Sequence, residues 1–131
     1  MGSEYTFYDY VDADGMGSNM INDWLNDGGR DAKAGLNAII RHLEATPPAL
    51  WSKPIAYPLH NEWRGFWELR KKIKRVPYRL IGKMEGREIL LVTWGFHKGR
   101  WRVEATVQTA KERVEQMIGE PVKYRREHDF S

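Results

Sequence analysis

The chain has no cysteine, which excludes disulfide bridges, thiolate metal sites and cysteine nucleophiles. It also lacks any apolar run near the roughly 18 residues that a membrane-spanning helix needs. Its first residues include Tyr5, Asp9 and Asp12 where a signal peptide would have a basic and then an apolar segment. Because a chain without cysteine suits a reducing compartment, we expect a cytoplasmic protein with no membrane partner.

The sequence has no acidic triad and no histidine pair that would indicate a metal site. We therefore expect no metal and no small-molecule cofactor. With 131 residues, of which 41% are hydrophobic, the chain can bury one core of its own. We expect a single domain over residues 1–121. Residues 122–131 are basic and show no periodicity, so we expect an irregular or mobile tail.

Positive charge is concentrated in one stretch, although the net charge is only +3. Residues 1–50 hold three basic and eight acidic side chains, whereas residues 64–83 hold eight basic side chains and a single acid, Glu68. We expect these cations on an apolar sheet that has one face in the core and one face turned to a polyanion such as nucleic acid. The alternative is charge complementarity within the protein, together with solubility.

The first half of the chain predicts one strand and two helices. Residues 5–11 have strong β propensity. A short helix follows, capped by Asp14 or Ser18 and ended by the glycines at 28–29, and a longer helix covers residues 30–46. The longer helix carries an apolar stripe at helical spacing, formed by Leu36, Ile39, Ile40 and Leu43.

The second half predicts three antiparallel strands and a helix. Residues 47–60 contain four prolines and should cross in extended form from the helices to the sheet. Strands are expected at residues 65–75, 78–84 and 88–96, the last two joined by a hairpin loop that holds a glycine. A helix should cover residues 106–118. The predicted fold is therefore α+β, a small antiparallel sheet with an N-terminal helix hairpin on one face and a C-terminal helix.

Four short motifs in this order and spacing resemble the RelE/ParE toxin superfamily, and most of all its HigB-like, phage-derived branch. The motifs are Gly65-Phe66-Trp67-Glu68-Leu69-Arg70, Tyr78-Arg79, Leu90-Leu91-Val92-Thr93-Trp94-Gly95-Phe96-His97-Lys98 and Ala110-Lys111-Glu112-Arg113. The resemblance implies a RelE/ParE-like fold and the toxin of a type II toxin-antitoxin system. Such a toxin is neutralised by a cognate antitoxin protein and most often cuts mRNA on the ribosome, whereas the ParE branch poisons DNA gyrase.

One departure from the family pattern concerns its basic turn. The family usually has two adjacent lysines followed by threonine and proline, and here Gly99 replaces the second lysine. Three functions therefore remain open: a metal-independent mRNA endonuclease, a gyrase-directed toxin, and a basic interaction domain without catalysis.

The resemblance implies catalytic roles for Arg79, Lys98, Arg70 and His97. Arg70 and Arg79 match arginines of the family motifs, and guanidinium groups bind phosphate oxygens two at a time, so we expect them to stabilise the reacting phosphate. Each could instead pair with Glu68 or be solvated. With an ordinary pKa near 6.5, His97 could act as base or acid. We expect Arg70, Arg79 and Lys98 to converge on one open patch.

Further residues are candidates for contact with nucleic acid. The basic ones are Lys71, Lys72, Lys74, Arg75, Arg100 and Arg102. Trp94, Trp101 and Tyr78 could stack on bases, although aromatic side chains in a sheet more often belong to the core. Tyr124 and His128 could fold back and supply a proton donor.

Overall fold

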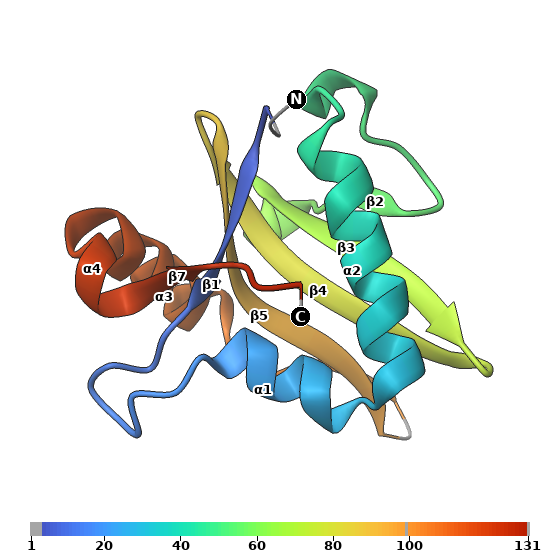
Figure 1. Ribbon diagram of the computed structural model, residues 1–131, viewed down its shortest axis with the longest axis horizontal. Helices are drawn as coiled ribbons and strands as arrows, with labels where there is room; N and C mark the ends of the chain where they lie inside the picture. The colour runs from blue at the N-terminus through green and yellow to red at the C-terminus, as the bar shows by residue number, and fades with distance from the viewer. Residues whose placement is uncertain (1–3, 99, 131) are drawn as a thin grey trace.

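A mixed β-sheet with helices on both faces forms this structure (Figure 1). The computed structural model describes residues 4–98 and 100–130, with the backbone alone at 96–98, 100 and 101. Within these residues the strands are β1 (Thr6–Tyr10), β2 (Ala56–Pro58), β3 (Phe66–Ile73), β4 (Val76–Glu85), β5 (Glu88–Lys98), β6 (Arg100–Val103) and β7 (Arg125–Glu127). The helices are α1 (Met20–Asp27), α2 (Arg30–Glu44), α3 (Val107–Gly119) and α4 (Pro121–Tyr124), with two 3-10 turns, η1 (Pro48–Leu50) and η2 (Asn61–Trp63). No helix in this part of the chain is both long and apolar enough to cross a membrane.

The sheet has the order β2–β3–β4–β5–β1–β7, and β6 pairs with β5. The antiparallel pairs β3–β4 and β4–β5 confirm the three predicted strands. The prediction of an antiparallel sheet is wrong, because β1 runs parallel to β5, with Thr6 opposite Glu88. The chain leaves β1 through two helices before it reaches the other strands. A long connection of this kind lets the two strands run in the same direction, which a tight hairpin does not.

The predicted helix hairpin covers one face of the sheet. Asn19 caps α1 by accepting a hydrogen bond from the backbone N–H of Asn22 at 2.9 Å, so the predicted caps Asp14 and Ser18 are wrong. The apolar stripe of α2 packs on β3, β4 and β5 as predicted. The cluster includes Leu36, Ile40, Leu43, Leu69, Leu80 and Leu91.

The second face of the sheet is also packed, by α3 and α4. Thr106 caps α3 by accepting a hydrogen bond from the backbone N–H of Thr109 at 3.1 Å. The buried side of α3 meets alternate residues of the central strands, in a cluster that includes Ala110, Val114, Met117, Ile81, Leu90 and Val92. The prediction that one whole face turns to a polyanion is therefore wrong, because α3 covers its centre.

The C-terminal residues are part of the fold, and the prediction of an irregular tail is wrong. After α4, β7 adds to the open edge of β1, and Figure 1 shows the chain end crossing toward α2. The imidazole of His128 is buried, with its two ring nitrogens 2.8 Å from Asp9 Oδ1 and 2.8 Å from Asn37 Oδ1. The tail therefore covers a strand edge and supplies a partner for a buried carboxylate.

The β3–β4 hairpin closes through two residues that both have positive φ, Lys74 at 50° and Arg75 at 72°. The predicted strand at 65–75 therefore ends earlier, at Ile73. Positive φ at both positions is the pattern of a type I′ turn, which favours asparagine and glycine. A side chain with a Cβ costs about 1–2 kcal/mol in this region. Two cations occupy these positions at the exposed end of the hairpin (Figure 1).

Candidate phosphate-binding pocket

Arg70 and Arg79 lie opposite each other on β3 and β4. Their side chains meet at one carboxylate, because the Nε atoms of Arg70 and Arg79 lie 2.5 Å and 3.5 Å from Glu68 Oε1. The predicted convergence is thus seen for these two arginines. The alternative expectation, an ion pair of each with Glu68, is seen as well.

Glu68 is a nearly buried carboxylate, with 4% of its side chain exposed. It comes two residues before Arg70, so both point to the same face of β3. A buried carboxylate is stable only when it is paired, and the two guanidinium groups supply that pairing. The three groups together carry one net positive charge, and the contacts to Glu68 use Nε, the guanidinium nitrogen nearest the backbone.

Tyr57 also contacts Arg70. The guanidinium carbon of Arg70 lies 3.9 Å from the centre of the Tyr57 ring, within the range of a cation–π contact. Tyr57 belongs to the edge strand β2 and is paired with Glu68 in the register of the sheet. Arg70 is therefore held at two points, by a carboxylate and by an aromatic ring.

Tyr57 and the two arginines line a pocket of about 510 Å³ at the edge of the sheet. The lining consists of Pro54, Ile55, Tyr57, Arg70, Lys71, Lys72, Pro77 and Arg79. Cations and apolar surface thus share one hollow, a combination that fits a phosphate joined to an apolar or aromatic group.

The predicted catalytic residues Lys98 and His97 have side chains outside the described part of the structure, as has Arg100. The backbone places their strand beside the pocket, because Gly95 of β5 is the register partner of Arg79. Convergence of Lys98 with the two arginines stays a prediction.

The remaining predicted contacts to nucleic acid are distributed over two places. Lys71 and Lys72 are exposed at the pocket rim, and Lys74 and Arg75 form the hairpin turn beyond it. Arg102 is exposed on β6. The structure thus groups four of the six at one end of the β3–β4 hairpin.

Two of the aromatic candidates for base stacking, Trp94 and Tyr78, are partly buried and pack against the core. The rings of Trp94 and Trp24 are stacked with centroids 5.6 Å apart, and Tyr78 lies against the same tryptophan. The Tyr78 hydroxyl donates to the carbonyl of Gly28 at 3.3 Å. The packing alternative is confirmed for these two, while the side chain of Trp101 is outside the described part.

The tail residues do not line the pocket. The hydroxyl of Tyr124 donates to Asp14 Oδ2 at 2.6 Å. This hydrogen bond raises the pKa of Tyr124 and lowers the pKa of Asp14. The proposed role of Tyr124 or His128 as proton donor is therefore wrong for this arrangement, since both are engaged elsewhere.

Sequence reasoning named Glu68 as the alternative partner of both arginines, and it missed Tyr57. An acid two residues before Arg70 shares its face of the strand, so the spacing already indicated Glu68. Tyr57 gave no such signal, since nothing local shows that residues 56–58 pair with β3.

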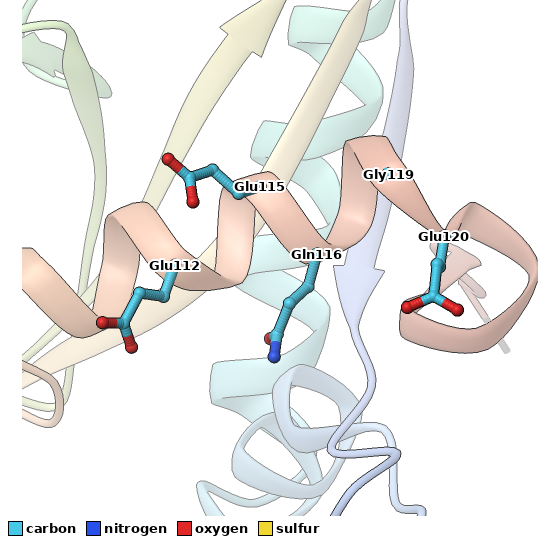
Figure 2. A pocket seen from close by; sticks show the side chains of 5 residues that line it. All are labelled: Glu112, Glu115, Gln116, Gly119 and Glu120. Carbon is cyan, nitrogen blue, oxygen red and sulfur yellow. The ribbon is translucent and has the colours of Figure 1, made fainter.

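A second hollow, of about 420 Å³, lies on the outer side of α3 and is acidic (Figure 2). Its lining includes Glu112, Glu115 and Glu120, and Figure 2 shows Glu115 pointing away from the other two. Within the described residues, no group of three acidic or histidine side chains could hold a metal ion. Carboxylates repel phosphate, so this hollow is not a candidate phosphate site.

No protein-family model matches the chain, and the searches of curated proteins and of solved structures found no match either.

Proposed function

We propose that the chain is the toxin of a type II toxin-antitoxin system, of the HigB-like branch of the RelE/ParE superfamily, and that it cuts mRNA on the ribosome in the cytoplasm. The observation that carries this proposal is the meeting of Arg70 and Arg79 in one open pocket. Guanidinium groups bind phosphate oxygens two at a time, so a phosphodiester fits these two neighbouring arginines.

Metal-independent cleavage of RNA needs a base for the 2′-hydroxyl, cations for the pentavalent phosphate and an acid for the leaving 5′-oxygen. In this proposal Arg70 and Arg79 stabilise the charge that develops on the phosphate, which can be the largest contribution to the rate. Lys98 and His97 are the proposed proton carriers. Glu68 and Tyr57 fix the guanidinium of Arg70, so that less reorganisation is needed during the reaction.

A second candidate is a basic domain that binds RNA without cutting it. Two observations favour it, the pairing of both arginines with Glu68 and the replacement of the second family lysine by Gly99. In either case we propose that the cognate antitoxin presents an acidic segment to the cationic pocket, so their association should weaken as salt increases.

Induced expression in a bacterial host separates these functions. The variants are Arg70→Gln/Arg79→Gln and, as a matched control with the same loss of charge, Arg87→Gln/Lys111→Gln. Both control positions are exposed and away from the pocket. Thermal unfolding of each purified variant verifies that it is folded.

Growth arrest by the wild type and the control, lost in the pocket variant, is the expected result. Arrest that persists in the pocket variant together with DNA damage would indicate a gyrase-directed toxin. A wild type that binds RNA but causes no arrest would indicate the non-catalytic domain.

A further inference from the structure

The end of the β3–β4 hairpin carries cations that the protein does not pair. Among the described residues, Lys71, Lys72 and Arg75 have no acidic group within ion-pair distance. Some other cations are paired, for example Arg113 with Glu104 at 2.6 Å. The unpaired cations of the hairpin lie close together in the chain, within residues 71–75.

The turn itself holds two cations in a backbone conformation that disfavours them. Lys74 and Arg75 have φ values of 50° and 72°, a region that asparagine and glycine adopt at lower energy than lysine and arginine. The ion pair of Lys74 with Asp31, at 3.4 Å, does not explain why a lysine occupies this strained position. The side chains of Lys74 and Asp31 are 82% and 64% exposed, and an exposed ion pair contributes little to stability. The strained turn therefore carries two positive charges that its stability does not require.

The composition of the tip indicates which part of a ligand it contacts. Residues 71–76 contain no aromatic side chain, so they offer no platform on which an unpaired base could stack. Lysine and arginine on a narrow two-stranded ribbon can still contact phosphates on both sides. In an RNA double helix the major groove is deep and narrow, which brings the phosphates of its two strands close together.

We propose that this hairpin tip binds the phosphate backbone of double-helical RNA. The inference rests on the proposed function only in taking RNA as the nucleic acid that this chain meets. Lys74 and Arg75 are absent from the lining of the arginine pocket, so the two contacts can be tested apart.

The test is the variant Lys74→Asn/Arg75→Gly, which gives the turn its preferred residues and removes both cations. The matched control is Arg87→Gln/Lys111→Gln, in which Arg87 lies in the turn at the opposite end of β4. Binding is measured by fluorescence anisotropy over a range of KCl concentrations. The probes are an RNA duplex of about 20 base pairs, one of its single strands, and a DNA duplex of the same sequence.

The turn variant should melt higher than the wild type by about 3 °C, because the strain is relieved. Its affinity for the RNA duplex should fall at least about tenfold, and the slope of log K against log salt should fall by about 2, since each lost phosphate contact contributes about 0.9. The control variant should keep the wild-type affinity and slope. The affinity of the turn variant for the single strand should fall less than its affinity for the duplex.

An unchanged melting temperature would overturn the strain argument, and unchanged duplex binding would overturn the contact. An equal loss of duplex affinity in the control variant would show that the net charge of the whole protein, and not the hairpin tip, determines binding. An equal loss for the single strand would exclude double-helical RNA as the specific ligand, and a DNA duplex bound at least as tightly as RNA would overturn the choice of RNA. Duplex binding is measured without cleavage, so its failure is distinct from a failure of the proposed nuclease.

Discussion

Replacing Glu68 by glutamine should make the pocket bind RNA more tightly while making the protein less stable. The carboxylate lies 2.5 Å from Arg70 Nε and 3.5 Å from Arg79 Nε. A phosphate on the outer guanidinium nitrogens would lie roughly 6–7 Å from Glu68, the length of the guanidinium plus two hydrogen bonds. At that distance, with an effective dielectric constant of about 20, the repulsion is about 2.5 kcal/mol.

The measurable gain is smaller, because the pocket is open to water and salt. We expect about 1 kcal/mol, which corresponds to binding about fivefold tighter. Stability should fall by about 1–2 kcal/mol, since the two arginines lose their shared partner. This loss stays below that of a fully buried pair, because the side chains of Arg70 and Arg79 are 36% and 20% exposed and can be hydrated.

The assay is fluorescence anisotropy with a short 2′-O-methyl RNA, which cannot be cleaved, together with thermal unfolding. Glu85→Gln is the matched control, because Glu85 also pairs with a cation, Lys83 at 3.3 Å, but lies outside the pocket. The control should leave RNA affinity unchanged. Weaker or unchanged binding by Glu68→Gln would refute the reasoning, because the ligand would then not lie on the outer side of these arginines.

Two further predictions concern the C-terminal residues. Tyr124→Phe removes the hydrogen bond to Asp14 and should lower the melting temperature at pH 7. In the wild type the hydrogen bond contributes fully to stability between pH 3.8 and pH 10.0, the ordinary pKa values of Asp14 and Tyr124. The contribution is lost as pH falls through the lowered pKa of Asp14 or rises through the raised pKa of Tyr124. The melting temperatures of variant and wild type should therefore converge at both extremes of pH, and a difference independent of pH would contradict this. His128→Ala leaves Asp9 buried without its imidazole partner. The free energy of unfolding, measured in urea, should fall by about 2–4 kcal/mol. A fall below about 1 kcal/mol would show that other contacts hold the tail.

The helices and the antiparallel strands could be predicted because their signals are local. The stripe of Leu36, Ile40 and Leu43 follows the period of a helix, and it is buried as that period requires. The hairpin at Gly86 follows from a glycine between two apolar strands, and Gly86 has a φ of 60°. Each of these features is set by residues that are close in sequence.

The direction of β1 and the place of the tail could not be predicted, because long-range contacts determine them. No local pattern around Asp9 shows that its buried carboxylate meets His128, 119 residues away. The sequence did suggest that Arg70 and Arg79 converge and that either could pair with Glu68, because the strands that carry them are local features. Pairing of β3 with β4 brings them together at Glu68.

The central claim is that Arg70 and Arg79 hold the reacting phosphodiester of an mRNA. Primer extension on a defined mRNA bound to purified ribosomes tests it most directly, with wild type, Arg79→Lys and Arg87→Gln compared at equal concentration. Lysine keeps the charge of Arg79 but lacks the fork that binds two phosphate oxygens. The account predicts discrete cuts with wild type and Arg87→Gln, and cutting slowed about a hundredfold by Arg79→Lys. Cuts of undiminished rate with Arg79→Lys would contradict it.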